Sequence, residues 1–171
     1  MYDRGDFLHI FTDNQIFELL YREKPTAVAG IMGSKEYPAI SGTLKLYQTK
    51  QGVFAVMLVY GLPKGTSDCD KPIFAVHIHN GTGCSGSEID PFANAGTHYN
   101  PNNFKHPFHS GDLPPIFSTE TVGWNAFFTD RFKVSEVLGL PVIIHSKPDD
   151  FTTQPSGNSG DKIACGIIMP V

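Results

Sequence analysis

The sequence lacks a basic excess, a long apolar run and an N-terminal signal. Among its 171 residues, 13 Lys and Arg stand against 17 Asp and Glu, for a net charge of −4. This balance argues against nucleic acid or an acidic membrane as a partner. No apolar stretch approaches the roughly 20 residues that a transmembrane helix needs. The first residues carry acids early and only a short apolar patch, unlike a signal peptide. We therefore expect a cytoplasmic protein on the sequence as given, and an extracytoplasmic one if a signal was removed.

Helical periodicity is also scarce after residue 25. Short apolar runs rich in β-branched and aromatic residues are separated by Gly, Pro and Ser, which is typical of strands joined by turns. Residues 41–48 alternate as a half-buried strand does, with Thr43, Lys45 and Tyr47 forming one of the two sets. The pattern predicts an antiparallel β-sandwich or barrel. The expected strands are 27–33, 41–48, 52–62, 72–80, 115–119, 123–132, 141–145 and 162–169.

Residues 1–25 differ in texture and are predicted to form an N-terminal arm, with residues 26–171 as the folded domain. Asp13 is placed to cap a short helix that would carry Ile16, Phe17, Leu19 and Leu20. We expect this arm to pack or dimerise without taking part in chemistry. His9 stands alone on it and is expected to be structural or exposed.

Histidine is concentrated in one stretch, from residue 77 to residue 112. Five of the seven histidines lie there, in a long Gly-, Asn- and Pro-rich segment. Neutral imidazole is the commonest metal ligand in proteins. The stretch therefore predicts a metal site. Its histidines are His77, His79, His98, His106 and His109.

The spacing within this stretch indicates how the ligands group. His77 and His79 are two residues apart on an expected strand, so both rings would project from one face while Ile78 enters the core. The remaining three imidazoles and Asp112 would together fill a tetrahedral shell of the kind that zinc prefers. His145 ends a later expected strand, where its ring could join the first pair.

Several separated segments resemble the copper/zinc superoxide dismutase family. They are HIHNGTGC, GTHYNP, the H-x-G-D of His109 to Asp112, VIIHSKPDD and SGNSGDKIACGII. They occur in the family's order, and the resemblance spans about Thr26 to Ile168. It implies an all-β, eight-stranded antiparallel Greek-key sandwich or flattened barrel, immunoglobulin-like, with two long functional loops.

The resemblance also implies a site with copper and zinc as cofactors. His98 would bridge the two ions as an imidazolate, because two cations on one ring make its second proton removable. Asp149 would hydrogen-bond one copper and one zinc histidine. The implied copper ligands are His77, His79, His98 and His145. The implied zinc ligands are His98, His106, His109 and Asp112.

Cysteine positions fit the same family. Cys84 and Cys165 match its intrasubunit disulfide. Cys69 is left over as a free or buried thiol, with intermolecular pairing still open.

Three departures from the family stand out. Lys162 occupies the place of the arginine that guides the anion to copper, and lysine keeps the charge but loses the planar two-donor fork. Ser156 replaces the usual channel threonine. The interval from His106 to His109 is shorter than in the well-known members, which indicates a bacterial-type protein with a short zinc loop. We expect activity to be retained but reduced.

The resemblance implies superoxide dismutase activity, in which superoxide, a small anion, is converted to dioxygen and hydrogen peroxide. The alternative is a non-enzymatic zinc- or copper-binding relative that keeps the fold, which Lys162 and the trimmed loop favour slightly. The full set of copper-type histidines argues for the enzyme. A homodimer is left open, since family members dimerise through different faces.

Overall fold

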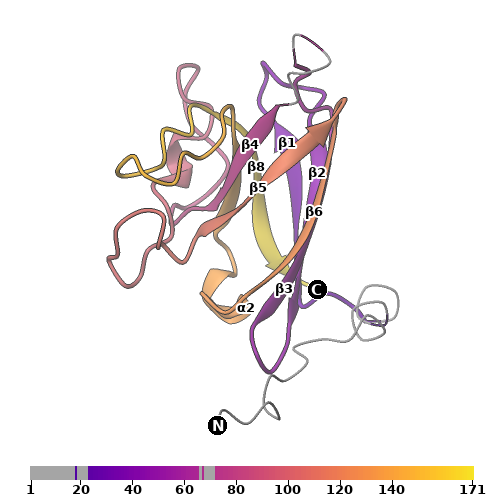
Figure 1. Cartoon of the computed structure of the whole chain (residues 1–171), viewed down its shortest axis with the longest axis vertical. Coiled ribbons are helices and arrows are strands. Elements are labelled where there is room, and N and C mark those ends of the chain that lie inside the picture. Colours follow the sequence, from indigo (N-terminus) through magenta and orange to yellow (C-terminus); the bar gives the residue numbers. More distant parts are fainter. Residues whose placement is uncertain (1–17, 19–22, 66, 68–71) are drawn as a thin grey trace, which may run out of the picture.

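A computed structural model describes residue 18, residues 23–65, residue 67 and residues 72–171 of the chain. The predicted arm lies outside the described residues except for Glu18 and residues 23–25, and so do His9 and Cys69. Eight strands close into one antiparallel barrel in the order β1-β2-β3-β6-β5-β4-β7-β8 (Figure 1). The predicted eight-stranded all-β fold is confirmed. The strands are β1 (Ala27–Gly33), β2 (Ser41–Gln48), β3 (Val53–Tyr60), β4 (Ile73–Ile78), β5 (Asp112–Thr119), β6 (Val122–Thr129), β7 (Pro141–His145) and β8 (Lys162–Pro170).

The barrel interior is filled by the inward side chains of these strands. Leu44, Met57, Phe74, Ile116 and Ile144 are among the fully or almost fully buried members of one apolar cluster. Burying an aliphatic or aromatic side chain of this size contributes about 1.5–3 kcal/mol relative to exposure. The interior is therefore a packed core, and the polar site must lie outside it.

Strand β2 departs from the expected alternation at its end. Leu44 and Leu46 are buried and Lys45 between them is exposed, as alternation requires, but Tyr47 is also buried although it belongs to the set of Thr43 and Lys45. A short helix, α2 (Val134–Val137), contacts β2. Leu46 and Tyr47 point to opposite faces of β2 and are both buried, so other parts of the fold cover both faces at this strand end. A strict alternation of buried and exposed residues does not predict this.

Two long loops lie side by side on one side of the barrel, where Figure 1 draws them in magenta to salmon and in gold. The first joins β4 to β5 and contains a 3-10 turn, η1 (Ala93–Ala95); the second joins β7 to β8. Strand β5 begins at Asp112, three residues before the expected start, so the first loop ends in a strand residue that carries chemistry. The two expected long loops are confirmed. None of the helices in the described part of the chain is long and apolar enough to cross a membrane.

Candidate metal centre

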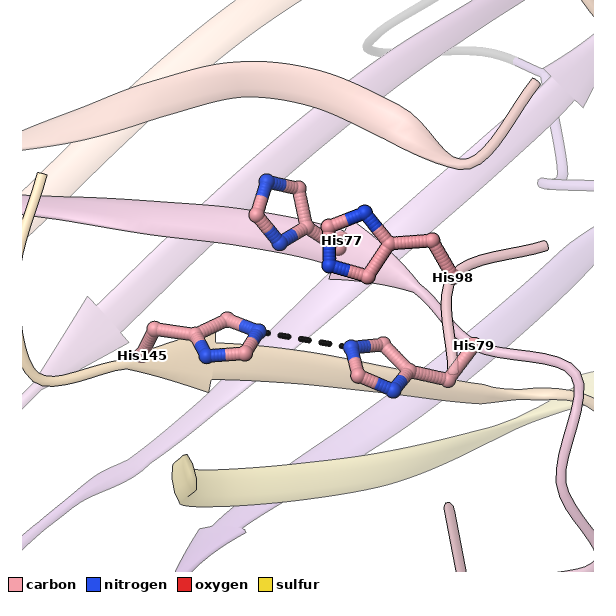
Figure 2. A group of neighbouring side chains, drawn as sticks. All are labelled: His77, His79, His98 and His145. Carbon is pink, nitrogen blue, oxygen red and sulfur yellow. Dashed lines mark hydrogen bonds between the residues drawn. The ribbon is translucent and has the colours of Figure 1, made fainter. Parts of the chain in front are cut away.

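The first loop and the strand ends bring four histidines together. His77 lies in β4, His145 ends β7, and His79 pairs with His98 in an isolated antiparallel bridge just beyond β4. All four side chains are buried, and one potential ligand atom from each lies within 4.8 Å of the others. Figure 2 shows the four rings pointing toward one another, with His79 Nε2 3.3 Å from His145 Nε2. The predicted geometry of His77 and His79 holds, because Ile78 between them enters the core cluster.

A second group lies beside the first and consists of His98, His106, His109 and Asp112. These four side chains are also buried and have ligand atoms within 4.8 Å of one another. His106 Nδ1 is 3.1 Å from Asp112 Oδ2, and His109 Nδ1 is 3.3 Å from Asp112 Oδ1. The backbone N–H of His109 donates to Asp112 Oδ2 at 3.0 Å, which holds the carboxylate against the loop. The short interval from His106 to His109 therefore still gathers the group.

His98 belongs to both groups. Its Nδ1 lies 2.7 Å from Asp112 Oδ1, in the second group. Its Nε2 is buried and has no hydrogen-bond partner among the described residues. The ring centroid of His98 is 3.9 Å from that of His77 and 5.4 Å from that of His109. One imidazole thus offers a nitrogen to each side.

Neighbouring acceptors fix the tautomers of the other rings, because an N–H that donates leaves the opposite nitrogen with a free lone pair. His79 Nδ1–H donates to the carbonyl of Gly96 at 2.9 Å, and His145 Nδ1–H donates to the carbonyl of Gly160 at 3.3 Å. Both arrangements leave Nε2 as the ligand atom. The two rings therefore present lone pairs to each other, which favours a cation between them.

The carboxylate of Asp149 fixes the tautomer of one histidine ring in each group in the same way. His77 Nε2–H donates to Asp149 Oδ2 and His106 Nε2–H donates to Asp149 Oδ1, both at 2.8 Å. The Nδ1 atoms of His77 and His106 are then buried with a free lone pair and no hydrogen-bond partner in the described structure. Buried nitrogens without partners are rare in folded proteins and call for an unseen partner. A bound cation would satisfy them.

Burial keeps the rings of His79 and His145 neutral. Burial lowers the pKa of His79 to about 3, and the positive charges of His98, His77 and Lys162 act in the same direction. Burial, with the charges of His77 and His79, lowers the pKa of His145 to about 2. Neutral imidazoles at neutral pH are the form that binds metal.

The acids of the site stay ionised. Burial tends to raise the pKa of Asp149, but the hydrogen bonds from His77, from the backbone of Phe151 and from His106 outweigh it and lower this pKa to about 2. Burial likewise opposes ionisation of Asp112, but the hydrogen bond from His98 and the electrostatic effects of His98, His106 and His109 together outweigh it and lower the pKa of this carboxyl. Two buried carboxylates therefore balance part of the positive charge that cations would bring.

The second loop is attached to the first through residues that carry no metal-ligand signal in the sequence. The Gln154 side chain accepts from the backbone N–H of His106 at 3.0 Å and donates to its carbonyl at 2.7 Å. Gly157 has a φ of +67°, and a Cβ there would stand 1.9 Å from Asp149 Oδ1. Glycine is required at this position because any side chain would displace the carboxylate.

A hollow of about 670 Å³ leads to the first group from outside, lined by His79, His98, His145, Ser156 and Lys162 among others. Ser156 and Lys162 are thus at the mouth, where the family resemblance places the substrate channel. Lys162 is not free, however: its Nζ donates to Asp90 Oδ2 and, at 3.2 Å, to the carbonyl of Phe92. The role of Asp90 was not predicted, because nothing in its sequence neighbourhood marks a partner 72 residues away.

The predicted disulfide is confirmed. Cys84 and Cys165 are bonded across a sequence separation of 81 residues. Phe92, Ala95 and Ile143 pack with the two cysteines in a small cluster of their own. The disulfide and this cluster fasten the first loop to β7 and β8. Closing a loop of this length stabilises by at most about 4–5 kcal/mol in the chain-entropy model.

The donor sets fit copper and zinc. Four imidazole nitrogens suit a tetragonal copper ion. Three imidazoles with one carboxylate suit a closed tetrahedral zinc site. The partnerless nitrogens of His77, His98 and His106 belong to these sets. A closed β-barrel with two adjoining groups that share one histidine defines a two-metal protein of the copper/zinc type.

Comparison with known proteins agrees with this class. The family model for copper/zinc superoxide dismutase matches residues 40–168. A copper/zinc superoxide dismutase of Aquifex aeolicus is 31% identical over 144 residues, which cover 75% of this chain and 79% of the relative. The chain therefore belongs to the copper/zinc superoxide dismutase family, whose enzymes are oxidoreductases that use copper and zinc.

Two solved structures share the fold. The copper/zinc superoxide dismutase of Brucella abortus superposes with a TM-score of 0.69 at 20% identity, covering 82% of this chain and 98% of that one. A double mutant of a superoxide dismutase-like protein from Bacillus subtilis gives a TM-score of 0.67 at 26% identity, covering 83% and 96%.

Proposed function

We propose that the protein is a superoxide dismutase that holds copper in the group of His77, His79, His98 and His145. Zinc would occupy the group of His98, His106, His109 and Asp112. The observation that carries this proposal is the shared ring of His98, which has one nitrogen beside Asp112 and the other buried without a partner. A one-metal site would need only one of these donor sets. A histidine shared by two complete donor sets therefore favours a site for two ions.

Copper in the first group would supply one-electron chemistry, so that two superoxide anions and two protons yield dioxygen and hydrogen peroxide; zinc has no redox chemistry of its own. The protein holds the ligand histidines in position. His79 and His145 are oriented by backbone carbonyls, and Asp149 orients His77 and His106 together. Such outer partners hold a ring's tautomer and direction and raise its basicity as a ligand.

The chain also handles charge and protons. His98 Nε2 is buried, faces no hydrogen-bond partner in the described structure and lies beside the hollow, so it can hold a proton that the peroxide product requires. Lys162 brings positive charge to the same hollow. A cation at the mouth of a cleft raises the local concentration of anions although the whole chain is negative.

The second candidate is a metal-binding protein without turnover. The pairing of Lys162 with Asp90 favours it, since this pairing reduces the charge offered to an anion. Similarity to a protein described only as superoxide dismutase-like is in keeping with it. The complete donor sets favour the enzyme.

One experiment separates the two candidates. The protein is loaded with copper and zinc, its metals are measured by elemental analysis, and inhibition of a superoxide-driven dye reduction is assayed. One copper and one zinc per chain with cyanide-sensitive activity support the enzyme. Zinc without copper, or both metals without activity, would move the assignment to the binding protein.

The Cys84–Cys165 disulfide favours an oxidising compartment over the cytoplasm. A homodimer remains a proposal, which size-exclusion chromatography with light scattering would test.

A further inference from the structure

Lys162 reaches the mouth of the hollow with its charge already paired. Its side chain is 18% exposed, and the carboxylate that contacts its Nζ belongs to Asp90, whose side chain is 43% exposed. Lys162 lines the hollow together with His79, His98 and His145, whereas Asp90 is not among the lining residues. The acid therefore contacts the ammonium without itself facing the hollow.

Asp90 is itself held in place by a compact turn. Its Oδ1 accepts from the backbone N–H of Phe92 at 3.1 Å, and its backbone N–H donates to Ser87 Oγ at 3.2 Å. Its carbonyl accepts from the N–H groups of Ser87 and Ala93. Because this turn lies between Cys84 and η1, the disulfide ties it to β8, where Lys162 begins the strand. The pair is thus a fixed feature of the mouth.

The two acceptors on Lys162 have different effects on an approaching anion. The Phe92 carbonyl at 3.2 Å holds the ammonium through a dipole and leaves its net charge unchanged. The Asp90 carboxylate brings a full negative charge next to it, and at a distance of several ångströms the field of such a pair largely cancels.

We propose that Asp90 attenuates the attraction of Lys162 for small monovalent anions and so sets how strongly the site captures its substrate. This inference rests on the proposed function, because it assigns Asp90 a role at the same hollow. Asp90 acts through Lys162 and is a residue that tunes substrate affinity without touching the substrate.

The test replaces Asp90 by asparagine, which keeps the size and an oxygen for the Phe92 N–H but removes the charge. Azide, a small monovalent anion, is titrated into the copper- and zinc-loaded protein, and binding is followed by the change in the copper absorption spectrum. We expect azide affinity to rise by roughly three- to tenfold at low ionic strength. The gain should shrink as salt approaches about 0.1–0.15 M, where exposed charges are screened.

Two matched variants make the result specific. Glu88→Gln makes the same change in net charge two residues away, at an exposed position outside the hollow, and should leave azide affinity within about twofold of the parent at the same low salt. Asp90→Ser, which also keeps an oxygen near the Phe92 N–H, repeats the test if the asparagine variant folds poorly.

Each outcome is decisive. Tighter azide binding in Asp90→Asn but not in Glu88→Gln supports the proposal. Unchanged binding, an equal gain in both variants, or weaker binding would overturn it, the last because Asp90 would then be holding Lys162 in a productive position. Failure of the parent protein to bind copper or azide would instead contradict the proposed function.

Discussion

The interior of the metal centre and its mouth are built differently. In the interior, six histidines and two aspartates are buried, and each ring that a neighbour orients is held by a backbone carbonyl or by the carboxylate of Asp149 or Asp112. At the mouth, Lys162 and Asp90 are both partly exposed and pair with each other across the loop. We expect interior residues to act by holding ligand atoms in place, so that substitutions there cost metal binding. Residues at the mouth act through the electrostatic potential that an anion meets, which paired charges and salt reduce.

We therefore expect substitutions in the interior to cause the largest losses of metal binding and activity. His145→Ala removes a nitrogen from the first group alone, so copper binding should fail while zinc is retained. Activity should drop by more than about 100-fold, beyond the 10- to 100-fold typical of an outer partner. Elemental analysis and the dye-reduction assay on the same sample check both parts. Loss of zinc together with copper would show that the two groups do not separate at this residue.

Asp149→Asn should have the next largest effect. An asparagine cannot accept from both His77 and His106 with a full negative charge, so both rings lose the partner that fixes their tautomers. We expect metal affinity to fall about 10- to 100-fold, measured by competition with a chelator. Asp150→Asn is the matched control, because among the described residues that exposed carboxylate accepts only from Thr152 and Thr153 nearby. Equal losses in both variants would point to a general disturbance of the loop.

Gly157→Ala tests whether the close approach of the second loop to Asp149 is needed for metal binding. Both Gly157 and Gly139 have positive φ values, so an alanine at either should destabilise by about 1–2 kcal/mol. Only at Gly157 would the new Cβ meet Asp149, since no atom in the described part of the chain lies within 4 Å of a Cβ at Gly139. Gly157→Ala should therefore lower the melting temperature more than Gly139→Ala does, and weakened metal binding should appear in Gly157→Ala alone. Metal affinity that is equally preserved in both would contradict the contact.

Lys162→Ala should have the smallest effect of the four, because Asp90 already offsets its charge. We expect the rate to fall severalfold at low salt and to depend less on salt than in the parent. Stopped-flow decay of superoxide at several ionic strengths measures both. A rate that is unchanged at low salt would remove Lys162 from substrate capture.

Much of the interior could be predicted from the sequence. The pair His77 and His79 shows the two-residue spacing of one strand face, and His145 ends a run of apolar residues that is typical of a buried strand. Both signals are local. The bounds of the strands followed from apolar runs and turn residues, with errors of a few residues at β5 and β6 where Pro and aromatic residues blur the pattern.

The remainder depends on contacts between distant segments. Gln154 meets His106 from 48 residues away, and Asp90 meets Lys162 from 72 residues away. Neither pair has a spacing that periodicity could reveal, because the barrel closure and the disulfide bring the loops together. The burial of Tyr47 was missed for a related reason, since cover at a strand end comes from elsewhere in the fold.

The central claim is that His98 serves both ions, and affinity measurements on His98→Ala test it most directly. Copper and zinc affinities are measured by chelator competition in the parent and in His98→Ala, with His145→Ala and His109→Ala as variants that touch one group each. We expect the parent to bind one copper and one zinc, His98→Ala to have a lower affinity for both ions, and each control variant to have a lower affinity for only one. Binding of a single ion by the parent, or a loss confined to one metal in His98→Ala, would contradict the shared ring.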